Sequence, residues 1–154
     1  MEVFAFSFVN DGFYHLEPNA ELTFDVICQA YRAEEKPVKT DVAAELAARM
    51  DFVHGIIDNC LVLDTPDDVI DREFRYSKIR AAESIINTRG GYMHAPGGES
   101  YYAAIWANDQ AEYVNPFFPF LGYDVGNKSV INSFKHFARF MNDKGEPIPS
   151  SIIA

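Results

Sequence analysis

The chain has 154 residues, 48% of them hydrophobic and 23% charged, which fits a folded globular protein of one or two domains and excludes a disordered chain. The formal charge of −10 makes nucleic acid and anionic membrane surfaces poor partners, because an acidic surface repels phosphate groups. The longest stretch without a charged side chain, residues 113–123, is too short for a transmembrane helix. The N-terminus lacks the basic region and the cleavage site of a signal peptide.

Cysteine and histidine residues are few and scattered. Cys28 and Cys60 are too few for a disulfide framework and belong to no CxxC pair, so we expect two buried thiols. The four histidines lie at positions 15, 54, 94 and 136, without HxH or HxxxH spacing. The sequence therefore predicts no metal site.

The N-terminal segment, residues 1–36, has the two-residue periodicity of β-strands. Phenylalanine alternates with small or polar residues over 4–8, and a second alternation runs over 22–28 after a turn near Pro18-Asn19. Two strands cannot bury a core alone, so this segment is expected to pack on something else.

Helical periodicity begins after Pro37. A first helix is predicted to start at Thr40 or Asp41. Its apolar side is expected to contain Val42, Leu46, Met50 (or Arg49), Val53 and Ile57.

The sequence Thr65-Pro66-Asp67-Asp68 predicts the start of a second helix, with Thr65 as the N-cap. This helix is expected to end before Gly90 and to be followed by a loop over residues 90–100. Its apolar side is expected to contain Ile70, Phe74, Ala81 and Ile85. Its solvated face is expected to contain Arg72, Arg75, Lys78 and Arg80.

Two further helices are predicted in the second half of the chain. The third starts near Asn108 and is disturbed by Pro116 and Pro119. The fourth is capped by Asn127, and the tail after Pro147 is expected to be extended. The residues of the fourth helix expected to face inward are Val130, Ile131, Phe134, Phe137, Ala138 and Met141. The predicted fold class is therefore mainly α with a small N-terminal β segment, divided into residues 1–36 and 37–154.

The stretch from Gly90 to Asn127 carries the chemistry. It contains no Lys or Arg, and it contains the only tryptophan of the chain, Trp106, followed by several polar residues. Aromatic faces stack on the C–H faces of sugar rings, while acids and amides bind hydroxyl groups, so the stretch suits a neutral polyhydroxylated ligand. The alternative is a core helix lined with aromatic residues, which we favour for Phe117, Phe118 and Phe120.

Three short motifs in this stretch, GGY at 90–92, APGG at 95–98 and YYAAIWANDQ at 101–110, resemble the first active-site loop of six-hairpin glycosidases. These are the (α/α)6-toroid glycoside hydrolases of the glucoamylase and α-L-rhamnosidase type, found in many gut bacteria. The resemblance extends over residues 61–149, and the segment before Lys36 is similar to the end of a β-sandwich that often precedes the toroid. A closed toroid has twelve helices, whereas about four are predicted here, so the resemblance implies an incomplete toroid.

The resemblance implies an oligosaccharide or glycoside as the substrate, hydrolysis without a cofactor, and self-association or attachment to the remainder of a longer chain. It also implies a periplasmic or secreted location for the full-length protein. Trp106 would be the stacking platform or wall of the sugar subsite. The sugar-binding residues implied are Trp106, Asn108, Asp109, Gln110, Tyr102 and His94.

The catalytic residues stay unassigned. Asp109 and Glu112 are the carboxylates nearest to Trp106, but three residues apart on a helix they share a face and do not flank a sugar from both sides. Asp109 is equally well explained as a cap at the start of a helix, and Glu112 as a solvated or structural residue. The alternatives to an enzyme are a non-catalytic carbohydrate-binding or assembly module and a purely structural helical domain.

Overall fold

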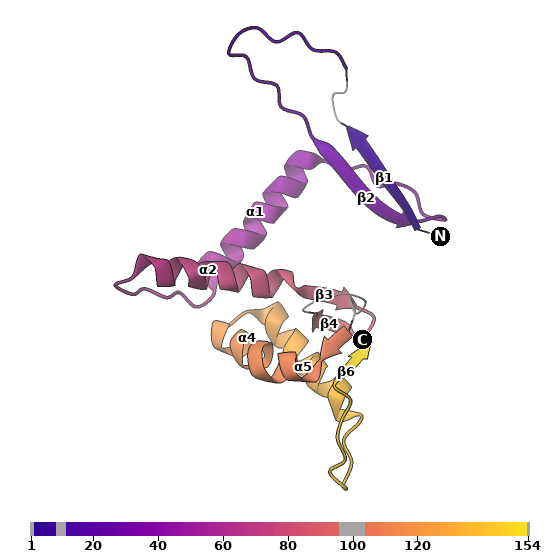
Figure 1. Cartoon of the computed structure of the whole chain (residues 1–154), viewed down its shortest axis with the longest axis vertical. Helices are drawn as coiled ribbons and strands as arrows, with labels where there is room; N and C mark the ends of the chain where they lie inside the picture. Colours follow the sequence, from indigo (N-terminus) through magenta and orange to yellow (C-terminus); the bar gives the residue numbers. More distant parts are fainter. Residues whose placement is uncertain (1, 9–11, 96–103, 154) are drawn as a thin grey trace. The chain divides into compact units, whose positions relative to one another are not determined.

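The computed structural model (Figure 1) describes residues 2–8, 12–95 and 104–153. The chain separates into two units, residues 1–50 and 51–154. Within the described residues the fold is mainly α-helical with small antiparallel pairs of strands, which confirms the predicted class at that level.

The first unit contains an antiparallel pair, β1 (Glu2–Phe8) and β2 (Val26–Arg32). The two predicted strands are therefore present, but the second starts at Val26 rather than at residue 22. The predicted turn at Pro18-Asn19 forms, with Asn19 in the left-handed region at φ 68°. Phe8 pairs with Val26, and this pair ends the described ladder between the two strands. Cys28, expected to be buried, is exposed on β2.

Side-chain hydrogen bonds fasten the segment after β2. Gln29 Nε2 donates to the Val38 carbonyl at 2.6 Å and to Thr40 Oγ1 at 2.9 Å. Asp41 Oδ1 then accepts the amide of Ala44 at 3.1 Å. Of the two predicted caps, Asp41 is therefore the residue that caps helix α1 (Val42–Asn59).

Helix α1 buries a smaller face than its apolar pattern predicts. Ile56 is buried, and Phe52, Val53 and Ile57 pack half-buried against the same cluster. Leu46 and Met50 remain exposed, at 62% and 48%. Periodicity identifies an apolar face, but only packing against another element buries it.

Helix α2 (Asp68–Glu83) begins at Asp67, whose side chain accepts the Val69 amide at 2.9 Å. Thr65, the predicted N-cap, instead donates its hydroxyl to Asp71 Oδ1 at 2.9 Å. The buried residues of α2 are Lys78, Ile79 and Ala82, whereas Ile70, expected inside, is exposed.

Lys78 lies inside the protein and not on the predicted solvated face, with 1% of its surface exposed. Its Nζ donates to the Ile57 carbonyl at 2.8 Å and to the Leu61 carbonyl at 3.0 Å. Ile57 lies in the last turn of α1 and Leu61 just beyond its end. Carbonyl groups at the C-terminal end of a helix have no main-chain donor within the helix. Lys78 therefore caps α1 from a second helix.

A hairpin replaces the predicted end of helix α2. Strands β3 (Ile85–Thr88) and β4 (Gly91–His94) pair where the sequence indicated first a helix and then a loop. Gly91 has φ 102°, a conformation that favours glycine. Helix α5 (Asp124–Ala138) holds the hairpin, since Asn132 Nδ2 donates to the Tyr92 carbonyl at 3.2 Å.

The third predicted helix is present as a continuous helical stretch of α3 (Ala107–Asp109), a π-helical turn η1 (Gln110–Val114) and α4 (Asn115–Leu121). The wide turn η1 ends two residues before Pro116, which has no N–H to donate. Just before α3, strand β5 (Ala104–Trp106) pairs with β6 (Ser151–Ile153), so the tail expected to be merely extended ends in a strand.

Helix α5 begins at Asp124, three residues before the predicted cap. Small residues form part of its buried face, and the ring of Phe118 lies against Gly126, which has no Cβ. The buried residues of α5 are Gly126, Ser129, Val130, Ser133 and Phe137. Ile131, Phe134, Ala138 and Met141, all expected inside, are exposed.

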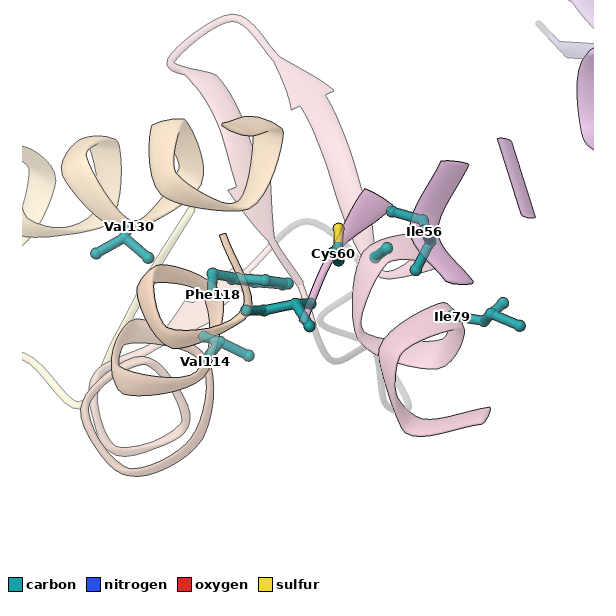
Figure 2. Close-up of a cluster of buried hydrophobic side chains, with 8 residues drawn as sticks. Ile56, Cys60, Ile79, Val114, Phe118 and Val130 are labelled. Atoms are coloured by element: carbon teal, nitrogen blue, oxygen red, sulfur yellow. The ribbon is translucent and has the colours of Figure 1, made fainter. Parts of the chain in front are cut away.

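The main core of the second unit collects side chains from α1, α2, η1, α4 and α5. Figure 2 shows Phe118 and Val114 on one side of this cluster, Ile56 and Ile79 on the other, and Cys60 between them. Of the three phenylalanines predicted as core, Phe118 is fully buried and Phe117 half-buried, whereas Phe120 is 72% exposed.

Candidate functional site

The end of strand β4 and the turn after strand β5 are joined by one side chain. Gln110, in the π-helical turn η1, donates from Nε2 to the main-chain carbonyl of His94 at 2.9 Å. His94 is the last residue of β4, and both residues are buried, with 8% of His94 and 2% of Gln110 exposed. Two predicted site residues that lie 16 positions apart in sequence are therefore in contact.

The other predicted residues occupy the turn directly before Gln110. Trp106 ends β5 and is half-buried, Asn108 is exposed, and Asp109 is half-buried at the end of α3. Tyr102 lies outside the described residues. Among the described residues, Trp106, Asn108 and Asp109 are therefore the members of the predicted set that reach the surface, whereas Gln110 and His94 are buried.

Gln110 has a different place from the one predicted. We expected its amide to bind sugar hydroxyl groups directly. Because the side chain is buried and donates to the protein backbone, Gln110 supports the turn that carries Asp109. Its second polar atom, Oε1, has no hydrogen-bond partner in the part of the chain that the structure describes.

His94 is an uncharged group at neutral pH. Burial lowers the pKa of His94 below its usual value of 6.5, and the nearby carboxylate of Asp109 opposes this shift only in part. The imidazole ring lies edge-on to Phe118, with 6.0 Å between ring centroids. Within the described ranges, His94 Nδ1 has no hydrogen-bond partner.

The two candidate carboxylates lie on one continuous helical stretch. Asp109 ends α3, and Glu112 lies exposed in η1, three positions further on. Glycoside hydrolysis requires two carboxyl groups that flank the bond to be cleaved. Side chains on adjacent turns of one helical stretch project from the same side, so this arrangement supplies at most one member of such a pair.

An apolar groove of about 230 Å³ adjoins the site between η1 and α5. The sequence pattern does not reveal this groove, because it predicts Phe134, Ala138 and Met141 in the core, whereas these side chains line the groove. The signal for it was the small residues Ala107 and Ala111 opposite a helical row of large ones. The remaining lining residues are Gln110, Asn115, Ser133, Phe137 and Ile148.

A larger hollow of about 630 Å³ belongs to the first unit and contains none of the predicted site residues. In residues 2–8, 12–95 and 104–153, no cluster of three or more His, Cys, Asp or Glu side chains is placed to bind a metal ion. No helix among these residues is long and apolar enough to cross a lipid bilayer.

No family model matches the chain, and no curated protein or solved structure is significantly similar to it.

Proposed function

We propose that this chain supplies part of the sugar-binding subsite of a glycoside hydrolase, with an oligosaccharide or a glycoside as the substrate. The observation that carries the proposal is the hydrogen bond from Gln110 to His94, which anchors the turn bearing Trp106, Asn108 and Asp109 to a neighbouring strand. A site held by such a buried bond loses little conformational freedom when a ligand binds.

Each of the three surface residues has a role in this proposal. Trp106 is the stacking platform for a sugar ring, because aromatic faces pack on apolar C–H faces. The carboxylate of Asp109 accepts hydrogen bonds from sugar hydroxyl groups, and bonds to a charged acceptor are stronger than neutral ones. The amide of Asn108 adds both a donor and an acceptor.

Hydrolysis proceeds by acid/base catalysis through an oxocarbenium-like transition state and uses no cofactor. One carboxylate, Asp109 or Glu112, lies at this subsite, and the second carboxylate of the pair comes from a different loop. In the same proposal, helices α1 to α5 are the first hairpins of an (α/α)6 toroid.

The test is sugar affinity and thermal midpoint measured on the same variants. Asp109→Asn keeps the shape of the side chain but loses the charge-assisted bonds, so affinity is expected to fall about tenfold to a hundredfold per bond. Trp106→Ala removes the platform and is also expected to weaken binding. Glu73→Gln, an exposed carboxylate of helix α2 outside the proposed subsite, is the matched control. Parental affinity in both Asp109→Asn and Trp106→Ala would show that this turn is not a sugar subsite.

A second candidate is a non-catalytic carbohydrate-binding or assembly module. The exposed apolar groove lined by Phe134 and Met141 favours it, because apolar surface of this kind marks contacts between proteins. The module is supported if the longest natural form of the protein binds sugars but does not hydrolyse aryl glycosides. Turnover that depends on Asp109 supports the enzyme.

A further inference from the structure

The apolar groove between η1 and α5 combines large and small side chains. The α3–η1 stretch contributes Ala107 and Ala111, and the α5 side contributes Phe134 and Met141. Phe134 is 59% and Met141 70% exposed, whereas the alanines project little beyond the main chain. The patch therefore contains projecting side chains and, beside them, a hollow.

The hollow has room for one aromatic ring. Its volume is about 230 Å³, and an apolar cavity of about 150 Å³ is enough to hold benzene. A second copy of the chain offers such a ring, because Phe134 projects from the same patch. In a symmetric dimer both copies use the same surface, so a patch that carries both the ring and the hollow is complementary to itself.

The area of the patch also fits a dimer. Phe134, Met141, Ile148 and Ile131, which lies one helical turn before Phe134, expose roughly 400 Å² of mostly apolar surface if a large side chain has about 200 Å². A standard interface buries about 800 Å² per partner, a little over half of it apolar. The patch therefore supplies the apolar share of such an interface, and polar residues at its rim supply the remainder.

The two rims of the groove carry opposite charges. Glu112 is exposed next to Ala111 in η1, and Lys135 is exposed next to Phe134 in α5. A two-fold axis along the groove places the η1 rim of one copy opposite the α5 rim of the other, so each Glu112 meets a Lys135. An axis across the groove would instead bring like charges together.

We infer that this patch binds a second copy of the chain about a two-fold axis along the groove. Phe134 of each copy enters the groove of the other, and Glu112 of each lies beside Lys135 of the other. A partner of another kind would need only half of this pattern, either the ring or the hollow. The inference specifies the partner in the second candidate function, and it does not depend on sugar binding.

The test separates the ring and the hollow into two variants. Ala111→Phe fills the groove, and Phe134→Ala removes the ring that enters it, so each variant alone is expected to raise the dimer dissociation constant at least about tenfold. An equimolar mixture of the two is expected to form a heterodimer, because the intact Phe134 of the first variant enters the open groove of the second. Both positions are exposed, so the thermal midpoints of the two variants are expected to match that of the parent.

Sedimentation velocity of the longest natural form of the protein, with one variant of the mixture fluorescently labelled, measures the dissociation constants. The buffer contains about 0.15 M salt, which screens the long-range repulsion between two copies of a chain with charge −10. Val62→Ala, which removes a side chain of similar exposure outside the patch, is the matched control and is expected to leave the constant unchanged.

Exchange of the rim charges tests the direction of the axis. Glu112→Lys and Lys135→Glu each place like charges opposite one another, so each variant is expected to weaken the dimer. The double variant exchanges both charges and is expected to restore the parental dissociation constant.

A monomeric protein would overturn the inference, because the groove would then be left open or covered by another segment of the same chain. A dimer that Ala111→Phe leaves intact would also overturn it, since association would then use a different surface. The same holds for a mixture that forms no heterodimer and for a double charge variant that stays as weak as the single ones. Sugar affinity, measured separately, decides the proposed function in each of these cases.

Discussion

The side-chain amide of Gln110 donates a hydrogen bond of 2.9 Å to the main-chain carbonyl of His94 and thereby joins the turn η1 to the end of strand β4. Both residues are buried, so water does not replace this bond when it is lost. The bond determines where Asp109, the residue before Gln110, lies relative to β4.

Replacing Gln110 by Met keeps the approximate volume of the side chain and removes its donor. The His94 carbonyl then lacks its partner, and we expect the free energy of unfolding to fall by about 1–3 kcal/mol. Chemical denaturation measures the change. Asn108→Ala, at an exposed position two residues earlier, is the control and is expected to cost less than about 0.5 kcal/mol. Equal stability of Gln110→Met and the parent would contradict the structural role of this bond.

His94 makes the stability of the fold sensitive to acid. Its pKa in the folded protein lies below the unfolded value of 6.5, so below pH 6.5 the unfolded chain binds more protons than the folded one. Stability is therefore full above pH 6.5 and falls as the pH drops from there towards the folded pKa, by at most about 1.4 kcal/mol per pH unit.

The variant His94→Phe keeps an aromatic ring against Phe118 and does not titrate. Urea denaturation of both proteins at pH 7, 6 and 5 measures the difference. We expect the parent to lose more stability than His94→Phe over this range. Parallel losses would show that other groups cause the acid sensitivity.

Lys78 is expected to be one of the most sensitive positions of helix α2. Lys78→Met retains the buried aliphatic chain but leaves the carbonyls of Ile57 and Leu61 without their donor. We expect a loss of about 2–4 kcal/mol in the free energy of unfolding. Arg75→Met removes the same charge from an exposed site of the same helix, and its cost is expected to stay within about 0.5 kcal/mol. Similar losses in the two variants would mean that charge, and not the capping bonds, is what matters.

Exposed apolar side chains predict self-association of the isolated chain. Phe134 is 59% and Met141 70% exposed beside the apolar groove. Surface of this kind is usually covered by another protein surface, so sedimentation velocity is expected to show species larger than a monomer at micromolar concentration. Replacing Phe134 and Met141 by Ser is expected to reduce association, whereas Val62→Ser, at a separate position of similar exposure, is not. A parent that sediments as a monomer would contradict this prediction.

Local signals indicated approximately where the first two helices begin, but not where α2 ends or where α5 begins. Asp41, one of the two predicted caps, caps α1, and an acidic residue caps α2 two positions after the predicted Thr65. These features depend on hydrogen bonds and backbone angles within about four residues, so the sequence alone contains them. For the same reason the turn that carries Trp106 and Asp109 could be identified as a unit from its order of residues.

Tertiary structure decided which face of each helix is buried. On α5 the sequence pattern favoured Val130 and Phe137, which are buried, but also Phe134, which is exposed. The core instead includes Ser129 and Ser133, and the absence of a Cβ at Gly126 allows Phe118 to approach the helix closely. Which residues of α5 are buried therefore depends on a side chain from another helix, and the periodicity of α5 alone does not predict it.

The candidate site likewise combines features that local sequence determines with features that only tertiary contacts determine. Its surface residues lie next to one another in sequence, whereas their support does not. The link from Gln110 to His94 exists because α2 ends at Glu83 and the chain turns into the hairpin β3–β4, which α5 holds through Asn132. Residues predicted as helix and loop thus became strands through contacts with a helix some 40 residues away. Contacts of that range form only when the whole core assembles, and for this reason the sequence could offer candidate site residues but not predict which of them reach the surface.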